Sequence, residues 1–372
     1  MIPLYLDHNA TAPLRPEAKA AMVAALDHVG NPSSVHRFGR EARRIVEDAR
    51  EQVAALVGVP AAAIVFTAGA TEANNAVLSG HGRPRTLVSA IEHDSVLAVP
   101  EDAEILAVGP DGLLDPATLD VALNAGEGPA LVSVMLANNE IGTIQPIAEL
   151  AAIARRHGAL FHCDAAQAVG KIPVDMAALG VDYLTLSAHK FGGPQGVGAL
   201  VVREGIAAPR LLKGGGQERR RRAGTENVAG IAGLGAACAA ASAGLEEFGA
   251  LGRLRDAVES RIRAACPSIR IFGQGAPRLP NTSCLTMPGV PAETQIMGFD
   301  LAGIAVSSGS ACSSGKVAAS HVLAALGIDG AEAETALRVS LGWTTRPGDI
   351  ERFVEAWITL RQRAARRSSA AA

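Results

Sequence analysis

Residues 159–202 contain three short aliphatic runs, ALFHCD (159–164), YLTLS (183–187) and ALVV (199–202), with helical and Gly-rich segments between them. Apolar runs of this length are typical of strands that are buried on both faces of a parallel sheet. Earlier runs continue the pattern, namely IVF (64–66), TLV (86–88), EILAV (104–108) and LVSVM (131–135). The sequence therefore predicts an α/β fold with a mainly parallel sheet of seven strands.

Helical patterns fill the gaps between these runs. Apolar residues recur at spacings of three and four over 41–57 and over 146–157. This spacing predicts amphipathic helices, and we expect them to cover both faces of the sheet. A further helical pattern runs over 349–361 near the end of the chain.

Length and composition indicate two domains. A chain of 372 residues is long enough for one large domain with a satellite. Helices that carry Arg and Glu begin near residue 248, and Pro- and Gly-rich turns follow them. We expect a large domain over 15–247 and a smaller α+β domain formed by residues 1–14 and 248–372, which includes a Ser- and Gly-rich loop at about 307–321.

Charge and cysteine content exclude several classes of protein. The chain has 34 Lys and Arg against 37 Asp and Glu, and this net charge of −3 provides no positive field for direct nucleic-acid binding. Five cysteines without any CxxC pair indicate neither a metal site nor a disulfide framework. The segment MIPLYLDHNATAP (1–13) has no signal-peptide pattern, so we expect a cytoplasmic protein. The uncharged run 228–245 is rich in Ala, Gly and Ser, and we interpret it as a closely packed helix and not as a membrane span.

A candidate anion site lies in FTAGATEANNAV (66–77), where a strand runs into a helix. The free N–H groups at Ala70 and Thr71, with the Thr71 hydroxyl, would form an anion cradle. From this segment alone, an ordinary turn with a helix cap is the simpler interpretation. Neither GxGxxG nor a Walker pattern is present, so the common nucleotide motifs do not apply.

Two charged residues follow neighbouring strands. Asp164 ends ALFHCD, and Lys190 follows YLTLS and precedes the Gly-rich FGGPQGVG (191–198). The carboxyl edge of an open α/β sheet is where such folds bind ligands. A desolvated lysine beside an aspartate matches the Schiff-base lysine and the pyridinium partner of pyridoxal phosphate enzymes. Taken singly, Asp164 is equally explained as a helix cap and Lys190 as a solvated loop charge.

Ordered motifs along most of the chain resemble the cysteine desulfurases of the NifS/IscS type, in the class V aminotransferase group of fold type I pyridoxal phosphate enzymes. The motifs are YLDHNATAP, NPSSVHRFGR, FTAGATEANN, IEHDSV, NNEIGTIQPI, HCDAAQAVGK, LSAHKFGGPQGVGAL, RAGTENV and SSGSACSS, and they extend from residue 5 to residue 314. The resemblance implies the family's fold, with a homodimer and pyridoxal 5′-phosphate as cofactor.

The resemblance also implies roles for individual residues. Lys190 would carry the cofactor, Asp164 would pair with the pyridine nitrogen, Gln167 would donate to the phenolate oxygen, and His93 would stack on the ring and handle protons. The phosphate would be held by Ala70, Thr71, Ser187 and His189, with Thr225 from a second subunit. Asn139 and Arg338 would clamp the substrate carboxylate, for which a bidentate Arg is well suited.

Among the reactions of this family, the resemblance implies sulfur removal because of Cys312. It lies among Ser and Gly in SSGSACSSGK, a composition that favours a loop over a packed core. For the other cysteines, namely Cys163, Cys238, Cys266 and Cys284, we expect buried and unreactive thiols. Cys312 would attack the sulfur of L-cysteine and keep it as a persulfide, leaving L-alanine.

Some features depart from the family or leave alternatives open. His8 replaces the usual Tyr, and the segment after Cys312 lacks a Pro that the family often has. The Arg run 219–222 is explained either as a solvated face or, for Arg219 and Arg222, as part of the site entrance and dimer contact. A selenocysteine lyase or a class V aminotransferase on the same fold is the alternative activity. The expected partners are an iron–sulfur scaffold or another sulfur-acceptor protein, with no membrane involved.

Overall fold

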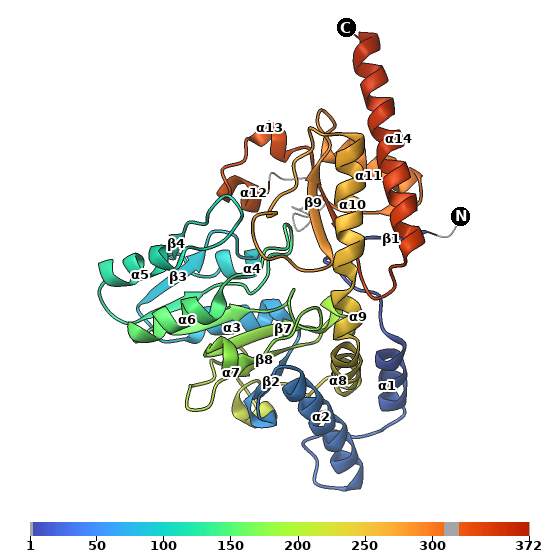
Figure 1. Cartoon of the computed structure of the whole chain (residues 1–372). Helices are drawn as coiled ribbons and strands as arrows, with labels where there is room; N and C mark the ends of the chain where they lie inside the picture. The colour runs from blue at the N-terminus through green and yellow to red at the C-terminus, as the bar shows by residue number, and fades with distance from the viewer. Residues whose placement is uncertain (1–2, 309–319, 372) are drawn as a thin grey trace.

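The core of the molecule is one seven-stranded sheet (Figure 1). The structure, a computed structural model, describes residues 3–308 and 320–371. In spatial order the strands are β2 (Ile64–Thr67), β8 (Gly198–Val202), β7 (Tyr183–Ser187), β6 (Leu160–Asp164), β5 (Ala130–Ser133), β3 (Arg85–Ser89) and β4 (Glu104–Leu106). β8 is antiparallel to both β2 and β7, and the pairings from β7 through to β4 are parallel. These strands coincide with the predicted runs, so the mainly parallel seven-stranded sheet is confirmed.

Helices cover both faces of this sheet, as predicted. Successive strand residues point to opposite faces, so Ile64 and Phe66 join one apolar cluster while Val65 joins another. The larger cluster packs against α2 (Arg37–Leu56), α5 (Pro116–Ala125), α6 (Ile147–Arg156) and α8 (Val228–Ala243). The opposite face is covered by α3 (Ala70–Gly80) and α4 (Asp94–Leu97), and the short α7 (Met176–Leu179) precedes β7.

Close packing explains the uncharged helix α8. It lies against α1 (Pro16–Leu26) and α2, and glycines allow the approach. A Cβ on Gly235 would lie 2.7 Å from the Ala49 Cα, and a Cβ on Gly233 would lie 2.6 Å from the Met22 Cγ. Within the described residues no single helix is long and apolar enough to cross a membrane, although the bent pair Val228–Ala243 and Leu245–Ala265 reaches that length and composition together.

A third apolar cluster joins the two ends of the chain. It contains Leu4 and Leu6 together with side chains from Phe248 to Trp357. Its elements are β1 (Leu4–Tyr5), α9 (Leu245–Gly249), α10 (Leu251–Ala265), β9 (Thr282–Thr286), α11 (Ala292–Leu301), β10 (Ile304–Ala305), β11 (Ala336–Ser340) and α14 (Pro347–Ala371), and the short α12 (His321–Ala325) and α13 (Gly330–Ala333) lie nearby. β1 pairs with β10 in parallel, and β9 pairs with β11 in antiparallel fashion. The domain division at residues 14/15 and 247/248 stays a prediction.

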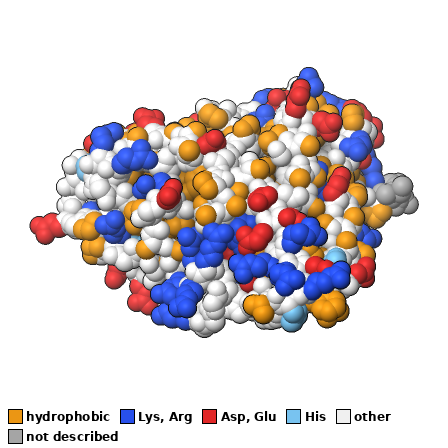
Figure 2. Space-filling model, turned by 90° about the horizontal axis from the view of Figure 1, so that it is seen from below, with side chains coloured by type: hydrophobic (Ala, Val, Ile, Leu, Met, Phe, Trp, Pro, Cys, Tyr) orange, Lys and Arg blue, Asp and Glu red, His pale blue; other side chains and the backbone are white. Residues whose placement is uncertain are grey.

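The Arg run, residues 219–222, lies in a surface segment that is held to the rest of the molecule by ion pairs and hydrogen bonds. Glu218, in the 3-10 turn Gln217–Arg220, forms a buried ion pair with Arg50 at 2.7 Å and accepts from the Phe66 N–H at 2.9 Å. Arg222 pairs with Glu72 at 2.9 Å. The view from below Figure 1 shows a face on which many Lys and Arg side chains lie close together, with Asp and Glu side chains between them (Figure 2). Arg219 also lies 3.7 Å from Glu47, so two of the four arginines of the run pair with carboxylates.

Candidate active site

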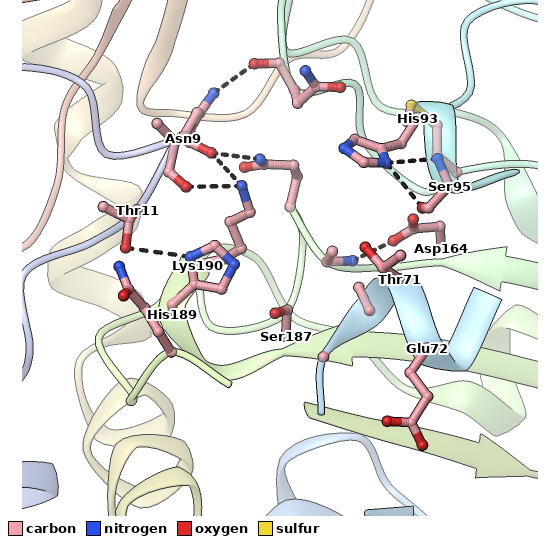
Figure 3. A pocket seen from close by; sticks show the side chains of 18 of the residues that line it. Asn9, Thr11, Thr71, Glu72, His93, Ser95, Asp164, Ser187, His189 and Lys190 are labelled. Atoms are coloured by element: carbon pink, nitrogen blue, oxygen red, sulfur yellow. Dashed lines mark hydrogen bonds between the residues drawn. The ribbon is translucent and has the colours of Figure 1, made fainter. Parts of the chain in front are cut away.

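The strand ends meet at one pocket. Its volume is about 840 Å³. Most of the predicted site residues line it, namely Ala70, Thr71, His93, Asn139, Asp164, Gln167, Ser187, His189, Lys190 and Arg338 (Figure 3). Thr225 does not: it lines a separate cavity of about 190 Å³ with Arg222 and Glu226. Cys312 lies outside the described residues.

Asp164 is held by hydrogen bonds at the end of β6. One carboxylate oxygen accepts from the Asn74 amide at 2.7 Å, and the other accepts from the Ala166 N–H at 2.9 Å. Asn74 is fully buried on α3 and also donates to the Ser95 hydroxyl at 2.9 Å. The carboxylate is thereby fixed at the pocket wall, where it can pair with a protonated ring nitrogen.

Lys190 reaches back to the N-terminal segment. It ends the 3-10 turn Ala188–Lys190 that follows β7, and its Nζ donates to the carbonyls of Asn9 at 2.8 Å and Ala10 at 3.0 Å (Figure 3). These two carbonyls hold the amine inside the pocket. The arrangement places an amine and the Asp164 carboxylate in the same cavity.

The start of α3 forms an anion-binding end of the pocket. Gly69 adopts φ 154° and ψ −178°, a conformation that is almost restricted to Gly. Gly69 also supplies no side-chain cap, so the first N–H groups of α3, at Ala70 and Thr71, line the pocket without one. Ser187 lies across from them: a Cβ on Gly69 would be 3.8 Å from the Ser187 hydroxyl. N–H groups at a helix start together with a hydroxyl suit a phosphate.

His189 and His93 each bring a hydrogen-bonding ring to the pocket. Burial, together with the charges of Lys190 and Lys171, lowers the pKa of His189 to about 4, and its Nδ1 lies 3.2 Å from the Thr11 hydroxyl. The Nδ1 of His93 accepts from the Ser95 N–H at 3.0 Å. Since an N–H group can only donate, the proton of a neutral His93 is on Nε2.

Arg338 closes the pocket from β11. Its guanidinium donates to the Asp7 carboxylate at 2.8 Å and to the Asn139 carbonyl at 3.1 Å. Its Nε is buried and has no hydrogen-bond partner among the described residues. An incoming carboxylate can therefore bind this guanidinium by replacing Asp7 as its anionic partner.

The four described cysteines are buried. Burial raises the pKa of Cys163, Cys238 and Cys284, so these thiols stay protonated at neutral pH. Cys266 is also buried, and its Sγ lies 3.4 Å from the Ser268 hydroxyl. None of these four residues lines the pocket of about 840 Å³.

Three polar residues of the site were missed by the sequence reasoning. Asn9 and Asn74 lie inside motifs that we quoted, and each makes buried hydrogen bonds to predicted site residues. Lys171 lies in HCDAAQAVGK and donates to Gln167 at 2.6 Å. The signal that could have found them is a polar side chain within an otherwise apolar or small-residue motif.

The residues fit pyridoxal phosphate. The pocket has an anion-binding helix start at one end, the fixed carboxylate of Asp164 in its wall and the amine of Lys190 inside it. This donor set matches the phosphate, the pyridine nitrogen and the aldehyde carbon of that cofactor.

Comparison with known proteins agrees with this geometry. The family model described as Aminotransferase class-V matches residues 4–353. The fold and the site thus define a member of the class-V aminotransferase family of pyridoxal-phosphate-dependent enzymes. A cysteine desulfurase of Cereibacter sphaeroides is 44% identical over 367 residues, which are 95% of this chain and 94% of the relative. The cysteine desulfurase IscS of Dictyoglomus turgidum is 42% identical over 363 residues, or 93% of this chain and 91% of the relative.

A solved structure shares the same fold over nearly the whole chain. The NifS-like protein of Rickettsia africae superposes with a TM-score of 0.89 at 36% identity, and the match covers 97% of this chain and 99% of the other. This chain belongs to the cysteine desulfurase family of the NifS/IscS type.

Proposed function

We propose that this enzyme removes sulfur from L-cysteine, giving L-alanine and a persulfide on Cys312 that is passed to an acceptor protein. The observation that supports this most is the single pocket in which Lys190, Asp164 and Arg338 meet, in a chain of the cysteine desulfurase family. The reaction needs an amine to hold the cofactor, a fixed carboxylate beside the pyridine nitrogen and a cation for the substrate carboxylate, and these three residues supply them in that order.

Bound pyridoxal phosphate supplies an electron sink for the bonds at the substrate's α- and β-carbons. Lys190 would hold the cofactor, and its amine could then move the α-proton. Asp164, fixed by Asn74, would keep the pyridine nitrogen protonated. Gln167 would donate to the ring oxygen, and the α3 start, Ser187 and His189 would bind the phosphate. Thr225 of a second subunit completes the phosphate site.

Substrate binding falls to Arg338 and Asn139. The guanidinium exchanges Asp7 for the carboxylate of L-cysteine, and its hydrogen bond to the Asn139 carbonyl sets its orientation. His93 lines the pocket with its Nδ1 held by the Ser95 N–H, so its Nε2 is the ring nitrogen that would transfer protons at the substrate.

Sulfur transfer needs a thiolate. The Cys312 thiolate attacks the substrate sulfur, and a new S–S bond forms as the C–S bond breaks. The electron pair of the broken bond stays with the carbon, which takes up a proton to become the methyl group of alanine. The four described cysteines are buried and lie outside the pocket, which leaves Cys312 as the proposed acceptor.

We further propose a cytoplasmic homodimer that hands its sulfur to an iron–sulfur scaffold or another acceptor protein. The exposed and mixed charge around the Arg run gives no reason to expect direct nucleic-acid binding.

Two substitutions test the proposed reaction. Cys312→Ser should retain the visible absorbance of the lysine-bound cofactor and its response to L-cysteine but lose alanine and sulfide release by at least about 100-fold. Lys190→Ala should lose both the absorbance and turnover. Near wild-type alanine release by Cys312→Ser would contradict the proposal. Transamination that does not need Cys312, or turnover restricted to selenocysteine, would identify one of the alternative activities.

A further inference from the structure

Asn9 uses every hydrogen-bonding group that it has. It is 1% exposed and follows β1 in the N-terminal segment. Its backbone N–H donates to the Ser340 hydroxyl at 3.0 Å, and its amide nitrogen donates to Asn139 O at 3.1 Å and Thr282 Oγ1 at 2.9 Å. Its side-chain oxygen accepts from Lys171 Nζ at 2.8 Å and Asn281 Nδ2 at 3.0 Å, and its carbonyl accepts from Gln167 Nε2 at 2.9 Å and Lys190 Nζ at 2.8 Å. A residue with all these groups satisfied has one fixed position.

Lys171 is the second member of this network. Its side chain is 2% exposed, and its Nζ donates to Gln167 Oε1 at 2.6 Å and to Asn9 Oδ1 at 2.8 Å. Among the described residues it makes no ion pair with a carboxylate. A buried amine without a carboxylate is costly to keep, so its contacts to Asn9 and Gln167 require an explanation.

These contacts fix the orientation of the Gln167 amide. The Asn9 carbonyl can only accept, so the Gln167 nitrogen must face it, and the Gln167 oxygen then faces Lys171. One N–H of the amide bonds to Asn9, and the second remains for a group in the pocket, which Gln167 lines. The same Asn9 carbonyl holds the amine of Lys190 beside this amide.

We propose that Lys171 is a positioning residue which, together with Asn9, holds the Gln167 amide so that its free N–H points at the anionic ring oxygen of the cofactor. The inference rests on the proposed function, because it takes Gln167 as the donor to that oxygen. Without Lys171, the Gln167 oxygen loses its partner, and the Asn9 carbonyl alone holds the amide. The hydrogen bond from the amide to the ring oxygen would then weaken, and the proton near the Lys190 nitrogen would be held more tightly.

The surroundings of this pair are charged on several sides. The charges of Lys190 after β7 and of Arg338 on β11 act on Lys171, and His8 of the N-terminal segment and His189 after β7 are coupled to it. Asp164 of β6 and His93 after β3 line the same pocket as Gln167. Burial, with the charges of Lys190 and Arg338, lowers the pKa of Lys171 well below its usual range. Loss of positive charge at Lys171 would also make the anionic ring oxygen hold the shared proton more tightly, as loss of the hydrogen-bond donor would.

A pH titration of the visible absorbance of the holoenzyme, without substrate, tests this role. Lys171→Met should raise the midpoint of the titration by about 1 to 2 pH units, which is the effect of one hydrogen bond to a charged oxygen. Lys19→Met, on the exposed side of α1, is the matched control and should leave the midpoint unchanged. A Lys171→Met midpoint equal to that of the control would overturn the proposal.

A double variant separates positioning from a direct charge effect. If Lys171 acts through Gln167, then Lys171→Met/Gln167→Leu should show the same midpoint as Gln167→Leu alone. Shifts that add in the double variant would refute action through Gln167. The titration needs no L-cysteine, so its result does not depend on whether the enzyme releases sulfide.

The wild-type holoenzyme provides a further measurement if Lys171→Met fails to fold. Its crystal structure should place the Gln167 nitrogen within hydrogen-bond distance of the ring oxygen and the Gln167 oxygen within that distance of Lys171 Nζ. A Gln167 side chain that is turned away from Lys171 would contradict the inference.

Discussion

Glu92 is a buried carboxyl next to the pocket, one residue before His93. It is fully buried, and its Oε1 accepts from the Met135 N–H at 2.7 Å. Burial raises the pKa of Glu92 well above its ordinary value, and the nearby Asp164 adds to the shift. The folded protein therefore keeps Glu92 protonated at pH values where the unfolded chain ionises it.

This shift predicts how stability depends on pH. A carboxyl whose pKa is raised by folding contributes its full stability below its unfolded pKa of 4.5, and that stability is lost as the pH rises toward the folded pKa. The loss for one proton is about 1.4 kcal/mol per pH unit. Glu92→Gln should remove this slope and raise the melting temperature at pH 8. The exposed Glu127→Gln is the control, and an unchanged slope in Glu92→Gln would contradict the interpretation.

At the residue scale, the sequence predicted the side chains at strand ends but not the residues that hold them. Asp164 and Lys190 follow strands that are visible as apolar runs, so their meeting follows from the topology of a parallel sheet. Asn9 and Lys171 are 162 residues apart, and Asn9 and Asn281 are 272 apart. Local sequence patterns cannot predict hydrogen-bonded pairs so far apart in the chain, because only the complete fold brings these residues together.

At the scale of elements, helix α8 depends on glycine at its contact with α2. Gly235→Ala would improve helix propensity, yet its Cβ would lie 2.7 Å from the Ala49 Cα. We expect a net loss of about 1–3 kcal/mol in the free energy of unfolding. Gly249→Ala, where a Cβ has no neighbour within 4 Å, should instead be neutral or stabilising by up to about 1 kcal/mol. Thermal unfolding of both variants checks this, and equal effects would show that propensity decides and packing does not.

The strands of the large sheet were predictable because they are buried on both faces and rich in aliphatic residues. β1 and β10 have two residues each and pair across Leu4–Ile304 and Tyr5–Ala305. Elements of this length have no periodicity to detect, and they form only because distant segments lie side by side in the folded chain.

At the scale of the whole molecule, the position of Thr225 outside its own pocket bears on the proposed dimer. It lines the separate small cavity with Arg222, and Arg222 pairs with Glu72 of the main pocket. Light scattering should give the mass of a dimer. Mixing equal amounts of Thr225→Ala and Lys190→Ala chains, with exchange of subunits, should restore about a quarter of the normal cofactor sites. About half of the dimers are then mixed, and one of the two sites in each mixed dimer has neither change. No restoration would place Thr225 in the site of its own chain.

The most direct test of the account is where sulfur appears after one reaction with L-cysteine. The holoenzyme is incubated with the substrate, its thiols are alkylated, and its peptides are analysed by mass spectrometry. We expect one added sulfur atom on the peptide that contains Cys312, together with an equivalent of alanine. Added sulfur on Cys163, Cys238, Cys266 or Cys284, or alanine formed with no sulfur on Cys312, would contradict it.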